Sequence, residues 1–110
     1  MTNKGQLYIP GIQPKIALGM IVKNEENVIE KTLASAIDAV DCMYIFDTGS
    51  TDNTINIINT FAKKYPTKKL YLKQGEFENF EVTRNTLLEW IDNHIDSIDI
   101  DFILLLDAND

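Results

Sequence analysis

The sequence predicts a single α/β domain built around a mainly parallel sheet. Two observations lead to this prediction: four apolar segments of strand length alternate along the chain with three segments whose apolar residues repeat at helical spacing. Strand–helix–strand units of this kind form parallel sheets with right-handed crossovers. The 110 residues, of which 45% are hydrophobic and 25% charged, suffice for one domain with a modest core.

The first elements are expected after a short leader. Residues 1–14 carry two glycines and two prolines and are expected to be flexible, so the domain is expected to occupy residues 15–110. The apolar run Ile16–Val22 predicts the first strand. Asn24 is placed to cap a helix over Glu25 to about Val40, whose apolar residues repeat at helical spacing.

The second strand and helix are separated by a polar turn. Cys42–Phe46 predicts the strand, and Asp47 leads into a glycine-containing turn after it. Ser50 or Thr51 is expected to cap a helix that stops at Pro66.

The rest of the chain holds two more strands around a third helix. Lys69–Lys73 alternates as a shorter strand, and Asp101–Leu106 is an apolar run that is typical of a strand buried on both faces. Apolar residues at helical spacing mark the helix between them: Val82, Leu87, Trp90, Ile91 and Ile95.

Polar residues follow three of the four strands, and parallel strands place their carboxyl ends on one rim. The three groups are Lys23-Asn24-Glu25, Asp47-Thr48-Gly49-Ser50 and Asp107-Ala108-Asn109-Asp110. Carboxylate and carboxamide oxygens in the last group suit Mg²⁺ or Mn²⁺ bound together with substrate phosphates. The competing interpretation is a set of solvated acids at a strand end.

Two single residues also have two interpretations each. Asp47 either contacts a ribose or a base, or accepts backbone N–H groups within its own turn. Arg84, the only arginine, either reaches a phosphate or a base, or pairs with Glu78 or Glu81 on the helix surface.

Other conspicuous residues are expected to be structural. Phe77, Phe80 and Trp90 are expected to pack the third helix onto the sheet, His94 to be exposed on that helix, and the lone Cys42 to be buried.

Composition and missing motifs exclude several classes. The net charge of −7 makes nucleic acid a poor partner. The sequence has no apolar run long enough to span a membrane and no signal segment, so an intracellular, cytoplasmic protein is expected. It has no GxGxxG after the first strand, which argues against a dinucleotide cofactor, and no GxxxxGK(S/T), which excludes a P-loop.

Four segments taken together resemble the N-terminal half of a family 2 glycosyltransferase with the GT-A fold. They are MIVKNEENVIEKTLASA, FDTGSTDNT, FENFEVTRN and FILLLDAND, in the family's order, and they place the chain in the DTGSTD branch. The resemblance implies a Rossmann-like sheet with helices on both faces. It also implies sugar transfer from a nucleotide-diphosphate donor, UDP-sugar foremost, to a glycan, lipid or protein acceptor, with Mn²⁺ or Mg²⁺ at a DxD motif.

The resemblance also assigns roles to individual residues. Ile21, Val22, Lys23, Asn24 and Glu25 are assigned to the nucleotide pocket, Asp47 to the base or ribose, Arg84 to the neighbourhood of the nucleotide, and Asp107, Asn109 and Asp110 to the metal-binding motif. Asn109 stands where the family usually has an aspartate, and its carboxamide can ligate a metal but brings no charge.

The family's domain continues past its DxD motif to an acceptor site and a general base. The chain is therefore expected to be a truncated donor-binding half that is incomplete for catalysis and able to self-associate. Two alternatives stay open: a non-catalytic nucleotide- or sugar-binding module, and a haloacid-dehalogenase-type phosphatase. The segment ILLLDAND also resembles the strand-plus-DxD motif of these phosphatases.

Overall fold

The computed structural model describes residues 15–94 and 100–107. The expected leader, residues 1–14, lies outside this range, as do Ile95, Asn109 and Asp110. In chain order the elements are β1 Ile16–Val22, α2 Ile29–Ala36, the 3₁₀ turn η1 Ile37–Ala39, β2 Cys42–Asp47, α3 Thr54–Lys64, β3 Lys69–Gln74, α4 Phe80–His94 and β4 Phe102–Asp107.

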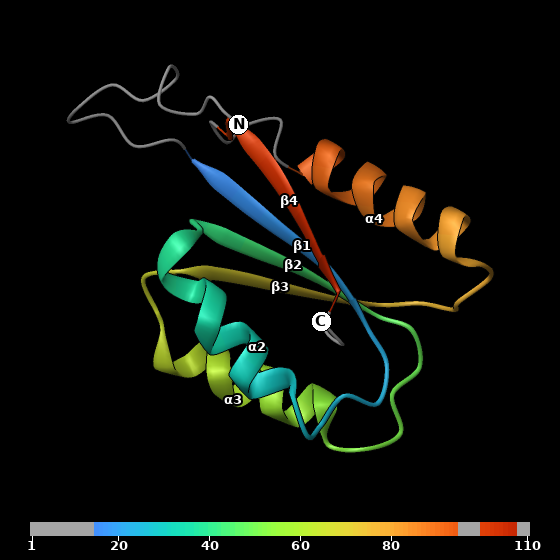
Figure 1. Cartoon of the computed structure of the whole chain (residues 1–110), viewed down its shortest axis with the longest axis horizontal. Helices are drawn as coiled ribbons and strands as arrows, with labels where there is room; N and C mark the ends of the chain where they lie inside the picture. The colour runs from blue at the N-terminus through green and yellow to red at the C-terminus, as the bar shows by residue number, and fades with distance from the viewer. Residues whose placement is uncertain (1–14, 95–99, 108–110) are drawn as a thin grey trace.

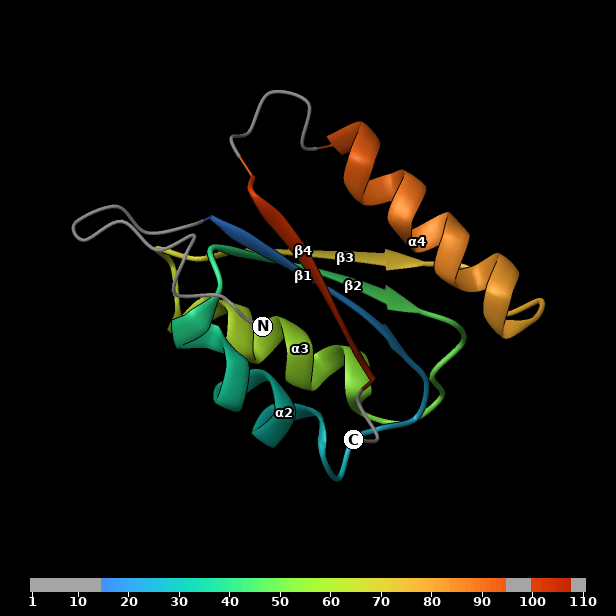
Figure 2. The same cartoon turned by 45° about the horizontal axis from the view of Figure 1, so that its top comes forward.

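The strands form a parallel sheet in the order β3-β2-β1-β4, so the predicted fold class is confirmed. Helices α2 and α3 lie on one face of the sheet and α4 lies on the other (Figures 1 and 2). The chain moves outward from β1 to β3 and then returns through α4 to place β4 on the other side of β1. Within the described residues, no helix is long and apolar enough to cross a bilayer.

The two faces of the sheet bury two separate apolar layers. Side chains alternate along β1, so Leu18 and Met20 pack toward α2 and α3, whereas Ala17 packs toward α4. Residues from α4 that complete the second layer include Leu87 and Ile91. Burying a side chain of this size contributes about 1.5–3 kcal/mol to folding, so the two layers hold the helices against the sheet.

The first helix begins four residues later than expected. Asn24 does not cap it, because its backbone is in the left-handed region with φ of 51° and α2 starts only at Ile29. The Asn24 carboxamide oxygen instead accepts the amide of Thr51, at 2.7 Å, from the loop after β2. A contact between segments distant in sequence has replaced the expected local cap.

The second helix also begins later than expected, at Thr54. Neither Ser50 nor Thr51 caps it. The carboxylate of Asp52 accepts both the amide of Thr54, at 2.9 Å, and its hydroxyl, at 2.6 Å. Asp52 therefore supplies the acceptor at this helix start that was expected from a hydroxyl residue.

The fourth strand is not buried on both faces in the described chain, so that expectation is wrong. β4 lies at the sheet edge and pairs only with β1 among the described strands. Phe102 and Leu104 are each 50% exposed and Leu105 is 39% exposed. An apolar run alone does not distinguish a central strand from an edge strand that helices leave partly uncovered.

The buried stripe of α4 includes Leu87 and Ile91, as expected, but not Val82. Thr83, Leu87 and Ile91 are buried, whereas Val82 is exposed. These three residues repeat every four positions, which keeps them on the face that contacts β1 and β2. Val82 precedes this stripe by about 100° around the helix and faces away.

Candidate functional site

The rim predicted from the strand ends exists. Val22 of β1 lies beside Asp47 of β2, and Ile21 of β1 lies beside Asp107 of β4. Three strands therefore end side by side. Because the strand order reverses at β1, the crevice between β1 and β4 is the place where open α/β sheets bind ligands.

A cavity of about 740 Å³ occupies this crevice. Its walls come from β1 and the loop after it, from the end of β4, and from α4 with the loop that precedes it. The lining residues are Gly19, Ile21, Val22, Lys23, Glu25, Thr48, Phe77, Phe80, Arg84, Leu87, Leu105 and Leu106. The volume lies within the range of about 300–1,000 Å³ that is usual for small-molecule sites.

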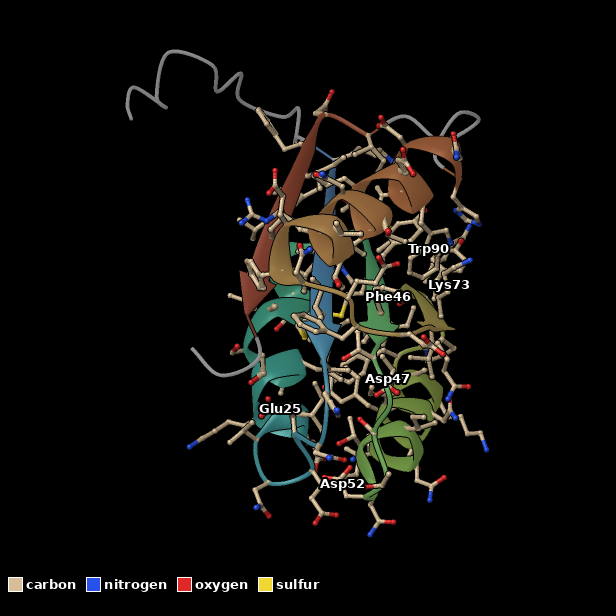
Figure 3. The ribbon with its side chains drawn as sticks, turned by 90° about the vertical axis from the view of Figure 1, so that its right-hand side faces the viewer. Glu25, Phe46, Asp47, Asp52, Lys73 and Trp90 are labelled. Atoms are coloured by element: carbon tan, nitrogen blue, oxygen red, sulfur yellow. The ribbon has the colours of Figure 1, made fainter. Side chains whose placement is uncertain are left out.

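Five of the residues assigned from the sequence line this cavity: Ile21, Val22, Lys23, Glu25 and Arg84. Asn24 and Asp47 do not appear in its lining. Figure 3 shows Glu25 and Asp47 at the same end of the molecule. The lining combines apolar side chains with charged and polar ones, and the lining residues of the two loops, Lys23, Glu25 and Thr48, are here called the mouth of the cavity.

Arg84 is an exposed side chain on the cavity wall. Its guanidinium carbon lies 5.0 Å from the centroid of the Phe80 ring, a cation–π distance. No ion pair with Glu78 or Glu81 is present, since the ion pair found in the described chain joins Lys64 to Glu30. Stacking on a ring leaves the N–H donors of a guanidinium free for an anion.

The aromatic residues before and in α4 fall into two groups. Trp90 packs as expected, with its ring edge-on to Tyr44 at 5.1 Å between centroids. Phe77 and Phe80 are 49% and 52% exposed, so the expectation that they pack the helix is wrong for both. They line the cavity instead. Helical spacing did not reveal this, because both residues lie in or beside the first turn of α4.

Asp47 is fully buried and acts as the acceptor of its own turn. One of its oxygens accepts the amides of Gly49, at 3.1 Å, and Ser50, at 3.0 Å, and the other accepts the Ser50 hydroxyl. Gly49 has φ of +114°, which favours glycine there. The turn interpretation of Asp47 is therefore the one seen in the structure, and a contact with a nucleotide stays a prediction.

The loops after β1 and β2 bind each other through a reciprocal network. The amides of Asn24, Glu25 and Glu26 donate to the side chains of Ser50, Thr54 and Asp52 at 2.8, 2.8 and 3.3 Å. In return, the amides of Thr51 and Asp52 donate to the Asn24 carboxamide, and the amide of Asn53 donates to Glu26.

One carboxylate of this network, that of Asp52, has a lowered pKa. Desolvation raises the pKa of Asp52, but hydrogen bonds from the Thr54 hydroxyl and amide outweigh it, so the pKa lies below its ordinary value. Asp52 is thus held ionised as an acceptor for both loops.

A partly buried polar contact on the α4 face was not foreseen. His94 is exposed as expected, yet its Nδ1 lies 2.6 Å from the hydroxyl of buried Tyr44. Burial raises the pKa of Tyr44 to about 12. Cys42 is buried as expected, and burial also raises the pKa of its thiol. The contact of Tyr44 with His94 ties the end of α4 to β2, and none of these three residues lines the cavity.

The predicted metal motif falls mainly beyond the described chain. The backbone of Asp107 ends β4 beside Ile21, whereas Asn109 and Asp110 lie outside the described residues. Within the described residues, no group of three or more His, Cys, Asp or Glu side chains is arranged to hold a metal ion. The assignment of a cation to this motif stays a prediction.

The fold agrees with comparisons to known proteins. Residues 18–110 match the model of glycosyl transferase family 2. Among curated proteins, none matches the sequence of this chain significantly.

Two solved structures are similar in fold. A mannosyltransferase from Pyrobaculum calidifontis, in complex with GDP-Man and Mn²⁺, gives a TM-score of 0.62 at 24% identity over 74% of this chain and 25% of its own. The second is glucosyl-3-phosphoglycerate synthase from Mycobacterium tuberculosis, in complex with Mn²⁺, UDP and glucosyl-3-phosphoglycerate. It gives a TM-score of 0.50 at 17% identity over 92% of this chain and 39% of its own. The chain thus spans less than half the length of either. With the family model matched over most of its residues, the chain belongs to glycosyl transferase family 2.

Proposed function

We propose that this chain is the donor-binding part of a glycosyltransferase and that it binds a nucleoside diphosphate sugar with a divalent cation. The observation that carries the proposal is the cavity at the reversal of strand order, lined by groups suited to a nucleotide. Membership of glycosyl transferase family 2 supports the reaction class. Because the chain spans only part of the similar enzymes, donor binding is proposed here and complete transfer is not.

The lining residues divide into three roles. The exposed rings of Phe77 and Phe80 offer apolar surface to a base or sugar. Arg84, stacked on one of these rings, offers N–H donors to a phosphate or a base edge. Lys23, at the end of β1, adds a second cation to the mouth of the cavity.

Asp107, Asn109 and Asp110 are proposed to hold the cation. The chemistry of the donor set fits Mn²⁺ or Mg²⁺, since carboxylate and carboxamide oxygens are the ligands these ions prefer. Both similar structures were determined with Mn²⁺. When bound, such an ion would neutralise charge on the diphosphate of the donor.

A thermal-shift and calorimetry series tests the proposal. The folded chain is titrated with UDP, GDP and ADP, each with and without Mn²⁺. Binding to the native state adds about 2.7 kcal/mol of stability when the ligand is present at a hundredfold excess over its Kd. We expect at least one nucleotide to stabilise the chain, and more strongly with Mn²⁺. A folded sample that responds to none of the three contradicts the proposal.

Two variants assign the binding to the cavity. Arg84→Ala should weaken nucleotide binding by about tenfold or more, because hydrogen bonds to a charged group contribute about 1.5–3 kcal/mol. Lys63→Ala is the matched control, since it removes the same charge from an exposed position at the end of α3. Asp107→Asn should mainly reduce the effect of Mn²⁺. Equal losses in Arg84→Ala and Lys63→Ala would show that net charge alone is responsible.

A further inference from the structure

The reciprocal network between the loops after β1 and β2 is centred on one side chain. The Asn24 carboxamide oxygen accepts two consecutive amides of the second loop, from Thr51 at 2.7 Å and Asp52 at 3.3 Å. The Asn24 amide itself donates to the Ser50 hydroxyl at 2.8 Å. The Ser50 hydroxyl in turn donates to buried Asp47, so the Asn24 amide is linked to the end of β2 through Ser50.

The backbone of Asn24 is as unusual as its contacts. It is the only residue other than glycine in the described chain with a positive φ, at 51°. Asparagine tolerates this conformation better than most residues, and glycine tolerates it best. A glycine would keep the backbone geometry and lose the three hydrogen bonds that the carboxamide oxygen accepts, from the Thr51 amide and hydroxyl and from the Asp52 amide. The choice of asparagine therefore points to the carboxamide and not only to the turn.

Residues on both sides of Asn24 line the cavity, although Asn24 does not. Lys23 and Glu25 come from its own loop, and Thr48 comes from the loop after β2. Thr48 is itself tied to β1, because its amide donates to the Val22 carbonyl at 3.0 Å. The contact of Asn24 with the loop after β2 holds the backbone that carries Lys23 and Glu25.

We propose that Asn24 is a positioning residue for donor binding: its carboxamide locks the loop after β1 onto the loop after β2 and so sets the mouth of the cavity. The inference rests on the proposed function, because it assumes that the cavity binds the donor. It differs from the role expected from the family resemblance, in which Asn24 belongs to the pocket itself. Here Asn24 acts through its neighbours.

Three variants separate the backbone from the side chain. Asn24→Gly keeps the left-handed backbone and removes the acceptor, whereas Asn24→Asp keeps an acceptor oxygen in a residue that also tolerates this backbone. Asn27→Gly, the same substitution at an exposed position of the same loop, is the matched control. Amide hydrogen exchange and the Kd for UDP with Mn²⁺ are measured for each variant, well below its melting temperature.

We expect Asn24→Gly to weaken nucleotide binding about fivefold or more and to speed exchange of the Thr51 and Asp52 amides about tenfold. The amide resonances of Lys23, Glu25 and Thr48 should shift in the same variant. Asn24→Asp should restore affinity and protection, and Asn27→Gly should match the unmodified chain. A lower melting temperature with unchanged affinity would mean that Asn24 is merely structural and would overturn the proposal.

Failure of the proposed function gives a different result. If the unmodified chain binds no nucleotide, donor binding is wrong, and the exchange and resonance data alone decide the role of Asn24. Unchanged amide exchange at Thr51 and Asp52 in Asn24→Gly then overturns the proposal that the Asn24 carboxamide holds the two loops together. Faster exchange together with shifted resonances at the cavity mouth supports it for whichever ligand the cavity takes.

Discussion

Replacing Gly19 with alanine should destabilise the fold through one identifiable contact. A Cβ at this position in β1 would lie 2.9 Å from Cδ1 of Ile91 and 2.9 Å from Cδ2 of Leu105. Carbon atoms prefer separations of about 3.5–4.0 Å, so each neighbour would have to retreat by roughly 0.6 Å. Leu105 is 39% exposed and has room to rotate outward, whereas Ile91 is fully buried under α4 and does not.

The magnitude follows from two opposing terms. Overpacking a core costs about 1–3 kcal/mol. Replacing glycine lowers the entropy of the unfolded chain and returns about 0.4–1 kcal/mol. The net loss in the free energy of unfolding should therefore be about 1 kcal/mol, or about 4 °C in melting temperature for a chain of this size. Urea denaturation followed by circular dichroism measures it.

A double-mutant cycle identifies the responsible atom. Ile91→Val deletes Cδ1, the atom that the new Cβ would meet, and alone should cost about 0.5–1.5 kcal/mol. In the double variant, the new methyl group fills the space that Cδ1 vacated. The loss of stability in the double variant should therefore be smaller than the sum of the two single losses by about 0.5 kcal/mol or more. Strictly additive losses would refute this account of the packing between β1 and α4.

Three further outcomes are expected. Because burial raises the pKa of Tyr44 to about 12 from 10.0, the free energy of unfolding should fall as pH rises from about 10 to about 12. Tyr44→Phe should flatten this dependence, and equal slopes of stability against pH in both proteins would contradict it. The buried thiol of Cys42 should react with an alkylating reagent on the order of 100-fold more slowly in the folded chain than in urea, and comparable rates would show that it is accessible. The half-exposed edge of β4, which has no second neighbour among the described strands, should promote self-association, and Leu104→Lys should reduce it. Light scattering that shows a monomer at every concentration would refute this.

Strands were predicted more accurately than helix starts, and the reason is physical. Continuous apolar runs such as Ile16–Val22 are visible in the sequence itself, and the observed strand has these bounds. Helix starts depend on which partner a polar side chain finds. Asn24 and Ser50 were expected to cap locally, but their hydrogen bonds reach the opposite loop. Local sequence does not encode such a choice when two partners of similar strength compete.

The site was predicted in part for a similar reason. The parallel sheet brought Lys23 and Glu25 to the cavity as expected, because strand ends converge whatever the side chains do. Phe77 and Phe80 were missed, since an aromatic residue beside a helix start has the same sequence signature whether it is buried or faces a cavity. The burial of Asp47 depends on the exact turn that follows it, which the sequence left open.

The arrangement of the sheet also governs the order in which the cavity forms during folding. β1 and β4 lie side by side and both line the cavity, yet their adjoining ends are far apart in the chain: the Lys15 amide donates to the carboxylate of Asp101, 86 residues away, at 2.9 Å. β1, β2 and β3 pair through shorter connections, and closing a shorter loop costs less entropy, so we expect these strands to associate first. Nucleotide binding would then appear only in the last kinetic phase of refolding, when β4 docks. Nucleotide binding that appears with the earliest refolding phase in a stopped-flow experiment would show that the cavity does not need β4.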